Sequence, residues 1–158
     1  MAFALYEKGK LEDAERVAAE GLASPAPDSY LYYLHAVILL KRGSPDNERI
    51  LRELAIAEST IPSCSLCYLA ESKAHRALGD IKAAIADLEC AVRLSPDLAE
   101  AWYHLAPLYD RVGRRVDAAS AREQFQKRRA DKEDRESEMI RNMFIHAFSS
   151  TQSSDPRP

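Results

Sequence analysis

The sequence predicts an all-α protein, in which antiparallel helix pairs repeat along the chain and stack into a solenoid. The stretch 99–113, AEAWYHLAPLYDRVG, places bulky and small side chains three to four residues apart along one helical stripe, which must be buried. Counting back 34 residues from Gly113 reaches Gly79, and Tyr68 then takes the place of Trp102. Most prolines lie between the expected helices, where a missing N–H costs little.

The spacing of these residues resembles the tetratricopeptide repeat, a 34-residue helix pair with the pattern W-x2-L-G-x2-Y, then A-x3-F, then P. Trp102, Leu105 and Tyr109 stand at the first positions, and Ala106 stands where the family has Gly. The preceding unit supplies the second half of the pattern with Ala84, Leu88, Ala91 and Pro96. The resemblance covers residues 1 to about 130 and implies a tetratricopeptide-type α-solenoid with a long C-terminal helix.

Two further copies follow once this phase is fixed, because Gly9 lies 34 residues before Gly43. The step from Gly43 to Gly79 is 36 residues, and the segment 44–46 accommodates the two extra residues. We therefore expect repeats over 1–132, with one partial unit at 1–28 and complete units at 29–64, 65–98 and 99–132. The first unit lacks the opening half of its first helix, so we expect the chain to be a fragment cut from a longer array.

The charge distribution does not indicate a nucleic-acid surface. The net charge is −3. Residues 111–141 hold ten Lys or Arg against seven Asp or Glu, a net charge of +3, so the remainder carries −6. A modest basic end on an acidic body is typical of a solvated helix, and we expect no nucleic acid as partner. An α-solenoid whose helical repeats bind RNA, one base per repeat, is the alternative. The spacing of the Trp or Tyr, Gly-Asp and Pro positions fits the tetratricopeptide pattern better.

The sequence also predicts a soluble chain without a signal peptide or a transmembrane segment. The apolar run at 30–40 has 11 residues, which is too short to cross a bilayer. Residues 1–9 lack a basic region leading into an apolar run. We therefore expect no membrane partner, and the compartment of the parent protein stays open because the start of the chain looks cut.

The family resemblance implies that the first helices of the pairs line a concave groove, which holds an extended peptide or a helix of a partner protein. The side chains expected in this groove lie opposite the Trp102 stripe, and they are Tyr30, Tyr33, Val37, Lys41, Leu69, Lys73, Arg76, Tyr103, His104 and Arg111. Aromatic anchors beside basic groups suit a partner segment with apolar side chains and at least one carboxylate. For any single tyrosine, packing between adjacent units is an equal alternative. The sequence lacks the two Asn that the family's clamp for chaperone C-termini needs, so that partner is not expected.

Cys64 and Cys67 form a CxxC motif at the start of an expected helix. This spacing permits a disulfide or two metal ligands, and the helix N-terminus favours a thiolate. Cys90, near the end of the following antiparallel helix, should return towards Cys67. No second CxxC and no His at ligand spacing accompany the motif, so we expect neither a metal nor another cofactor. Small-residue positions in repeats also accept Cys as a compact hydrophobe.

No catalytic constellation is evident. The four histidines, His35, His75, His104 and His146, lie in different segments, and no nucleophile and carboxylate frame any of them in sequence. His75 takes the place of Tyr109, so we expect it to be a hydrogen-bonded core histidine. Glu71 takes the place of Leu105 and breaks the apolar pattern, so its charge must reach solvent or a basic partner.

The C-terminal part of the sequence predicts one long helical segment. From Val116 to about Phe148 there is no Gly or Pro, and 126–138 is polar on every side with i,i+4 pairs of opposite charge. Apolar residues then return in an amphipathic segment at 133–148, and those expected to serve self-association or capping are Met139, Ile140, Met143, Phe144 and Phe148. Either this segment folds back to cap the stack, or one helix of about 33 residues, near 50 Å long, projects towards a second copy. The charged run favours projection. Residues 149–158 predict a disordered tail.

Together these features predict a non-catalytic scaffold for protein–protein interaction, which binds a partner in the groove and self-associates through its C-terminal helix. A thiol redox or metal-binding protein centred on Cys64 and Cys67 is the alternative from a different class. A second alternative is that the chain is a spacer fragment of a larger enzyme or regulator.

Overall fold

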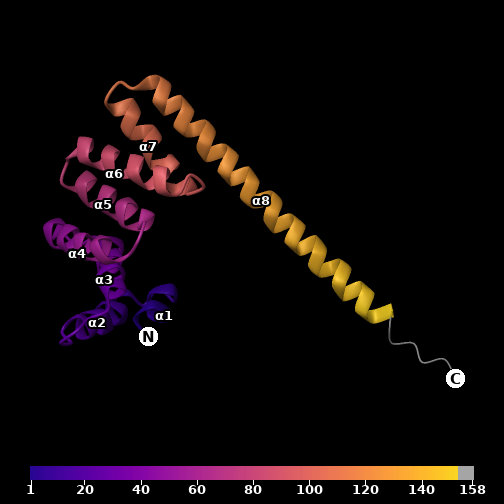
Figure 1. Cartoon of the computed structure of the whole chain (residues 1–158), viewed down its shortest axis with the longest axis horizontal. Helices are drawn as coiled ribbons and strands as arrows, with labels where there is room; N and C mark the ends of the chain where they lie inside the picture. The colour runs from indigo at the N-terminus through magenta and orange to yellow at the C-terminus, as the bar shows by residue number, and fades with distance from the viewer. Residues whose placement is uncertain (153–158) are drawn as a thin grey trace.

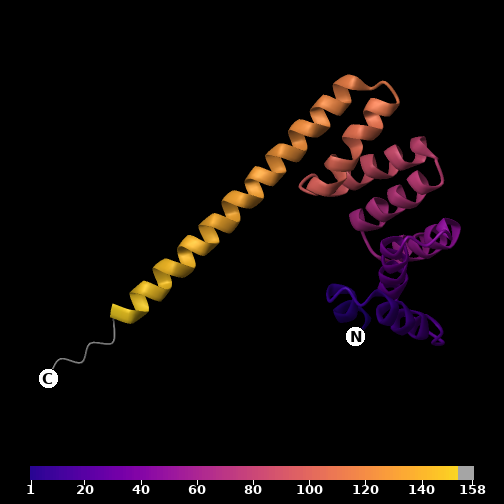
Figure 2. The same ribbon diagram turned by 180° about the vertical axis from the view of Figure 1, so that it is seen from behind.

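The computed structural model describes residues 1–152, which form eight α-helices and no β-strand (Figure 1). The helices are α1 (Ala2–Glu7), α2 (Leu11–Leu22), α3 (Ser29–Arg42), α4 (Asn47–Thr60), α5 (Ser65–Ala77), α6 (Ile81–Leu94), α7 (Ala99–Arg111) and α8 (Arg115–Gln152). The prediction of an all-α chain is therefore confirmed over the described residues. Helices α1 to α7 form a column with the N-terminus at one end and α7 at the other, as both views show (Figures 1 and 2).

Each helix packs on its neighbours in the chain, and the buried side chains form three connected clusters. The first joins α1, α2 and α3 and includes Leu34 and Ile38. The second joins α3, α4 and α5 and includes Ile50 and Leu54. The third joins α5, α6, α7 and α8 and includes Leu105. Because α3 and α5 contribute side chains to two clusters each, the core is continuous although every contact is made between near neighbours.

The ends of the helices repeat the same local chemistry. Gly43 ends α3 in the left-handed conformation, at φ 71°, which a residue with a Cβ adopts only at a cost. The other glycines of the expected phase, Gly9, Gly79 and Gly113, also have positive φ. Asp46 and Asp80 then cap α4 and α6, each accepting a hydrogen bond of 3.0 Å from the backbone N–H three residues on. A glycine with positive φ therefore marks the turn within each pair, and an Asp cap follows it in the α3/α4 and α5/α6 turns.

The three aromatic residues at equivalent sequence positions, Tyr32, Tyr68 and Trp102, are all partly buried. Tyr68 and Trp102 pack against the same cluster at α5 to α8. The Trp102 ring nitrogen donates a hydrogen bond of 2.9 Å to the carbonyl of Pro96, and the Tyr68 hydroxyl donates one to Glu58. The bond of Tyr68 thus joins α5 to α4 of the preceding pair, and that of Trp102 joins α7 to the turn before it.

Helix α8 packs on α7 in its first part and then leaves the stack (Figure 1). Ala118 and Ala121 are buried against α7, and the Arg128 guanidinium donates a hydrogen bond of 2.9 Å to the Pro96 carbonyl. Every residue from 129 to 142 is exposed. The helix does not turn back near 131–134, so the folded-back cap is wrong and the projecting helix is observed. Ion pairs such as Lys132–Glu136, at 3.7 Å, accompany the exposed helix, whose sequence contains no helix breaker.

Helix α8 runs without interruption across two boundaries predicted from the sequence. Nothing in the secondary structure separates 99–132 from 133–148, and the division of the chain into units stays a prediction. Residues 149–152 belong to α8, so the expected disordered tail is wrong there, since no Gly or Pro stops the helix before them. The rest of that tail, 153–158, lies outside the described residues. No helix in the described part is both long and apolar enough to cross a membrane.

Two histidines are held by carboxylates that are distant in sequence. His35 is 1 % exposed, and its Nδ1 lies 2.6 Å from Glu53 of α4, whose other oxygen accepts a hydrogen bond from Arg49. His75 Nδ1 lies 2.7 Å from Asp87 of α6. Each contact joins the two helices of one pair, so both histidines stabilise the packing of a pair. His75 is hydrogen-bonded as expected, but 26 % of its side chain is exposed, so it is not the core histidine that the sequence predicted.

Glu71 is the charged residue that the sequence pattern marked as out of place. It is 8 % exposed, and no salt bridge within the described residues involves it. Burial first, and then the negative charges of Glu58 and Asp87, raise the pKa of Glu71 to about 7. A buried carboxyl without a basic partner favours the protonated form, so the fold contains an acid that loses its proton near neutral pH.

Truncating a side chain of the third cluster should destabilise the whole α5–α8 region. Leu88 is fully buried, and Leu88→Ala should lower the free energy of unfolding by about 2–5 kcal/mol, because it removes apolar contact and leaves a cavity. Urea unfolding followed by circular dichroism measures the change. The control Val116→Ala alters a residue that is 83 % exposed and should change stability by less than about 0.5 kcal/mol. Equal effects of the two variants would contradict the assignment of the core.

Neutralising Glu71 should change how stability depends on pH. Because the pKa of Glu71 is raised from 4.5 to about 7 on folding, the folded chain keeps a proton that the unfolded chain releases, and stability falls as pH rises through this window. Glu71→Gln should therefore be more stable than the parent by about 1–3 kcal/mol at pH 8, with a smaller difference at pH 4. Thermal or urea unfolding at both pH values tests this. The exposed Glu48→Gln should show no such divergence.

Candidate functional site

A groove of about 780 Å³ lies on the inner side of the stack. Its walls are α3 and α5, α1 and α7 each contribute a residue, and the turn after α3 closes one side. These are the first helices of successive pairs. The groove therefore exists because the helix pairs stack in the same orientation, which brings α3 into contact with α5.

Six of the ten residues predicted for the groove line it. They are Tyr33, Val37, Lys41, Leu69, Lys73 and Arg76. Leu69 is only 5 % exposed and belongs to the floor. The Lys41 ammonium lies 4.5 Å from the centre of the Tyr6 ring, which brings α1 into the wall. Burial raises the pKa of Tyr33 to about 12, so its hydroxyl keeps its proton and can donate a hydrogen bond.

The other four predicted residues do not line this groove. Tyr30 packs on Tyr33 with ring centres 5.8 Å apart, at the outer edge of α3. Tyr103 packs on His104 and on Phe125 of α8, with ring centres 5.2 Å and 5.3 Å away. Arg111 is exposed at the last residue of α7. These side chains lie on the same inner helices, but the pocket spans about one and a half pairs and does not reach along the whole stack.

Glu100 of α7 organises the charges at the α5 side of the groove. Its carboxylate accepts a hydrogen bond of 2.7 Å from Lys73 and lies 3.6 Å from His104 Nε2. The hydrogen bond with His104, together with the one from Lys73, lowers the pKa of Glu100 to about 2. Arg76 continues the row, with its guanidinium 3.5 Å from His104 Nδ1. Lys73 is thus held in place by the chain itself, while the charge of the groove stays positive.

Several groove residues were not foreseen from the sequence. Tyr6, Leu40, Leu66 and Glu100 also line the groove, together with Gly43, Ser44 and Pro45 of the turn and Asn47 at the start of α4. Tyr6 was missed because the first pair is partial and lacks the aromatic residue that marks the start of the other units. Glu100 could have been found from the repeat, because it lies two helical turns before the position equivalent to Lys73 in the next unit.

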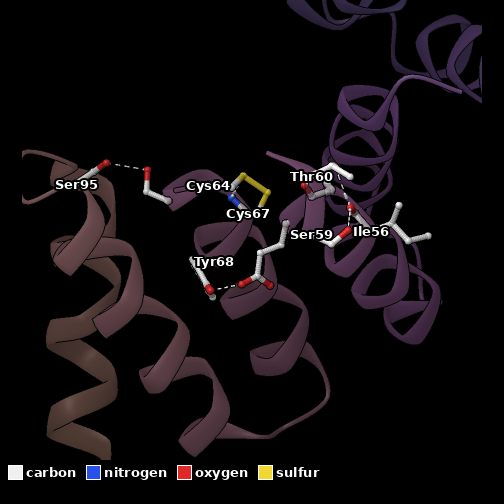
Figure 3. The surroundings of a disulfide bond; sticks show 10 residues. Ile56, Ser59, Thr60, Cys64, Cys67, Tyr68 and Ser95 are labelled. Carbon is white, nitrogen blue, oxygen red and sulfur yellow. Dashed lines mark hydrogen bonds between the residues drawn. A yellow bond between two sulfur atoms is a disulfide. The ribbon is translucent and has the colours of Figure 1, made fainter. Parts of the chain in front are cut away.

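Two of the three cysteines are bonded to each other. Cys64 and Cys67 form a disulfide at the start of α5 (Figure 3). Cys90 is a free thiol whose sulfur accepts a hydrogen bond from Arg93. Over the described part of the chain, no group of three or more His, Cys, Asp or Glu side chains could hold a metal ion.

The fold and this groove define a class of protein, the α-solenoids that present a concave surface. A family model described as "TPR repeat" matches residues 73–113. The match and the fold together identify tetratricopeptide repeats in this chain, and the resemblance predicted from the sequence is confirmed. A comparison with curated proteins gave no match.

The fold is similar to those of several solved structures. A MamA RS-1 double mutant has a TM-score of 0.73 at 20 % identity, with 84 % of this chain and 73 % of that chain covered. MamA from Desulfovibrio magneticus RS-1 has a TM-score of 0.66 at 22 % identity, with coverage of 85 % and 73 %. A monomeric IFIT1 mutant with m7Gppp-AAAA has a TM-score of 0.69 at 20 % identity, and the chain covers 31 % of it. At these identities the likeness concerns the fold.

Proposed function

We propose that this chain is a non-catalytic scaffold, which binds a peptide or helix of a partner protein in the groove between α3 and α5. The observation that carries the proposal is the composition of the groove. Apolar and aromatic side chains form its floor, and Lys41, Lys73 and Arg76 outnumber the single carboxylate of Glu100. A partner segment with apolar side chains and at least one carboxylate complements this surface.

A random peptide library tests this recognition. The chain should select peptides that carry apolar residues next to Asp, Glu or a free C-terminus. Tyr33→Ala combined with Arg76→Ala should weaken their binding by about 10-fold or more, since it removes an aromatic anchor and a cation. Isothermal titration calorimetry with a selected peptide measures the loss.

Two further variants sharpen this test. Glu100→Gln removes the carboxylate that neutralises Lys73 and should strengthen binding of the same peptide. The matched control, Arg52→Ala with Ile56→Ala, alters an exposed cation and an exposed apolar residue on α4, outside the groove, and should leave binding unchanged. Equal losses in the groove variant and the α4 control would place the binding surface elsewhere.

We also propose that α8 mediates self-association. Its projecting part exposes apolar residues, since Met139 is 59 % and Ile140 51 % exposed, and the sequence continues with the predicted Met143, Phe144 and Phe148, whose side chains lie outside the described residues. Residues 114–129 contain six Lys or Arg and two Asp or Glu, so this part of α8 is basic. Residues 130–142 contain three Lys or Arg and five Asp or Glu, so the following part is acidic. Two copies of α8 in antiparallel orientation would therefore place opposite charges side by side while covering the apolar end.

Removing the projecting part should reduce the size of the assembly. Light scattering should give the full chain a mass above the 17.7 kDa of one copy, and a chain ending at Ala130 the mass of a monomer. Met139→Ser with Ile140→Ser should have the same effect, because it removes apolar contact without shortening the helix. Ile56→Ser, at a residue of α4 that is 42 % exposed and lies outside α8, serves as the control and should not change the mass. A monomeric full chain would contradict the proposal.

A further inference from the structure

The disulfide between Cys64 and Cys67 links two residues of the same helical turn. Cys64 is the N-cap of α5, and Cys67 is the third residue of that helix. The bond therefore joins no two separate elements, and it closes a loop with a sequence separation of three. A disulfide stabilises a fold mainly by closing long loops in the unfolded chain, so this one contributes little to the stability of the stack. Its position calls for a chemical role.

The two sulfur atoms differ in access. Cys67 is completely buried, whereas Cys64 is partly exposed and lines a surface hollow of about 330 Å³. Ile61, Pro62, Tyr68 and Leu94 give this hollow its apolar walls, and the polar residues that also line it are Glu58, Ser59, Thr60 and Ser63. Figure 3 shows the pair at the start of α5, beside the end of α4. An incoming thiolate can therefore reach the sulfur of Cys64 before that of Cys67.

The backbone stabilises a negative charge on the more accessible sulfur. The Cys67 N–H donates a hydrogen bond of 3.2 Å to the sulfur of Cys64. Cys64 also lies at the N-terminal end of the 13 residues of α5, where the helix dipole is positive. Both interactions favour a thiolate at Cys64 once the disulfide is opened.

We propose that Cys64 and Cys67 form a site of reversible thiol–disulfide exchange with a dithiol polypeptide. A thiolate of the polypeptide attacks the sulfur of Cys64, the bond to Cys67 breaks, and Cys67 leaves as a thiolate that takes up a proton. The second thiol of the polypeptide then loses its proton and attacks the sulfur of the polypeptide's first cysteine in the mixed disulfide. This attack releases Cys64 as a thiolate. Two electrons pass to the pair, and the polypeptide leaves as a disulfide. The hollow beside Cys64 receives the apolar residues that flank the attacking cysteine.

The exchange can be measured on the full chain with Cys90→Ser, which removes the third thiol. Millimolar dithiothreitol should convert the pair to two alkylatable thiols within minutes without loss of helicity, and oxidised glutathione should restore the disulfide after the dithiothreitol is removed. At equal thiol concentration, a reduced CxxC peptide with apolar flanking residues should open the disulfide at least about 10-fold faster than glutathione. Mass spectrometry after alkylation reads both reactions. Resistance to dithiothreitol in the folded state, or reduced thiols that do not reoxidise, would overturn the proposal, and equal rates for peptide and glutathione would overturn its polypeptide substrate.

Single-cysteine variants test which sulfur is attacked. With Cys67→Ser and Cys90→Ser, the remaining Cys64 should form a mixed disulfide with a chromogenic disulfide reagent at least about 10-fold faster than Cys67 does with Cys64→Ser and Cys90→Ser. Cys67→Ala replaces Cys67→Ser if the polar side chain prevents folding at this buried position. Equal rates for the two cysteines in folded variants would contradict the assigned order of attack.

Discussion

The structure depends on the sharing of α3 and α5 between adjacent buried clusters. One helix pair cannot bury its own apolar stripe, so each pair is stabilised by the pair on either side. Leu34 and Ile38 of α3 pack towards α1 and α2, while Ala36 and Leu39 of the same helix pack towards α4 and α5. This constraint fixes the orientation of the first helices. Their remaining faces then lie on one side of the stack, and the groove results from that arrangement.

The groove is a property of neighbouring pairs and not of any one repeat. Lys73 belongs to α5, but its charge is balanced by Glu100 of α7, which in turn contacts His104. A change in one pair therefore alters the electrostatic potential that the next pair presents. This coupling explains how similar repeats can present different surfaces: the inward-facing residues vary, while the apolar stripe and the turn residues keep the stack intact.

Helix α8 satisfies two different requirements along its length. Its first part provides Ala118 and Ala121, whose small side chains let it approach α7 closely and complete the third cluster. Beyond Arg128 the helix makes its own stabilising contacts, through ion pairs between neighbouring turns such as that of Arg129 with Glu133 at 3.2 Å. The exposed Met139 and Ile140 follow this charged part. The helix thus carries apolar residues away from the stack on a solvated segment.

The sequence by itself determined the helical class, the repeat phase and the long terminal helix. These follow from local rules: a stripe at helical spacing must be buried, a glycine with positive φ ends the first helix of a pair, and a segment without Gly or Pro continues as a helix. Only the tertiary structure decided the pairing of His35 with Glu53, the contact between Lys73 and Glu100, and which predicted residues line the groove. Arg111, for example, lies on α7 together with Glu100 but does not line the groove. The two contacts, His35 with Glu53 and Lys73 with Glu100, join residues that are 18 and 27 positions apart. The distance between such residues depends on how the helices pack, and no local sequence pattern specifies it.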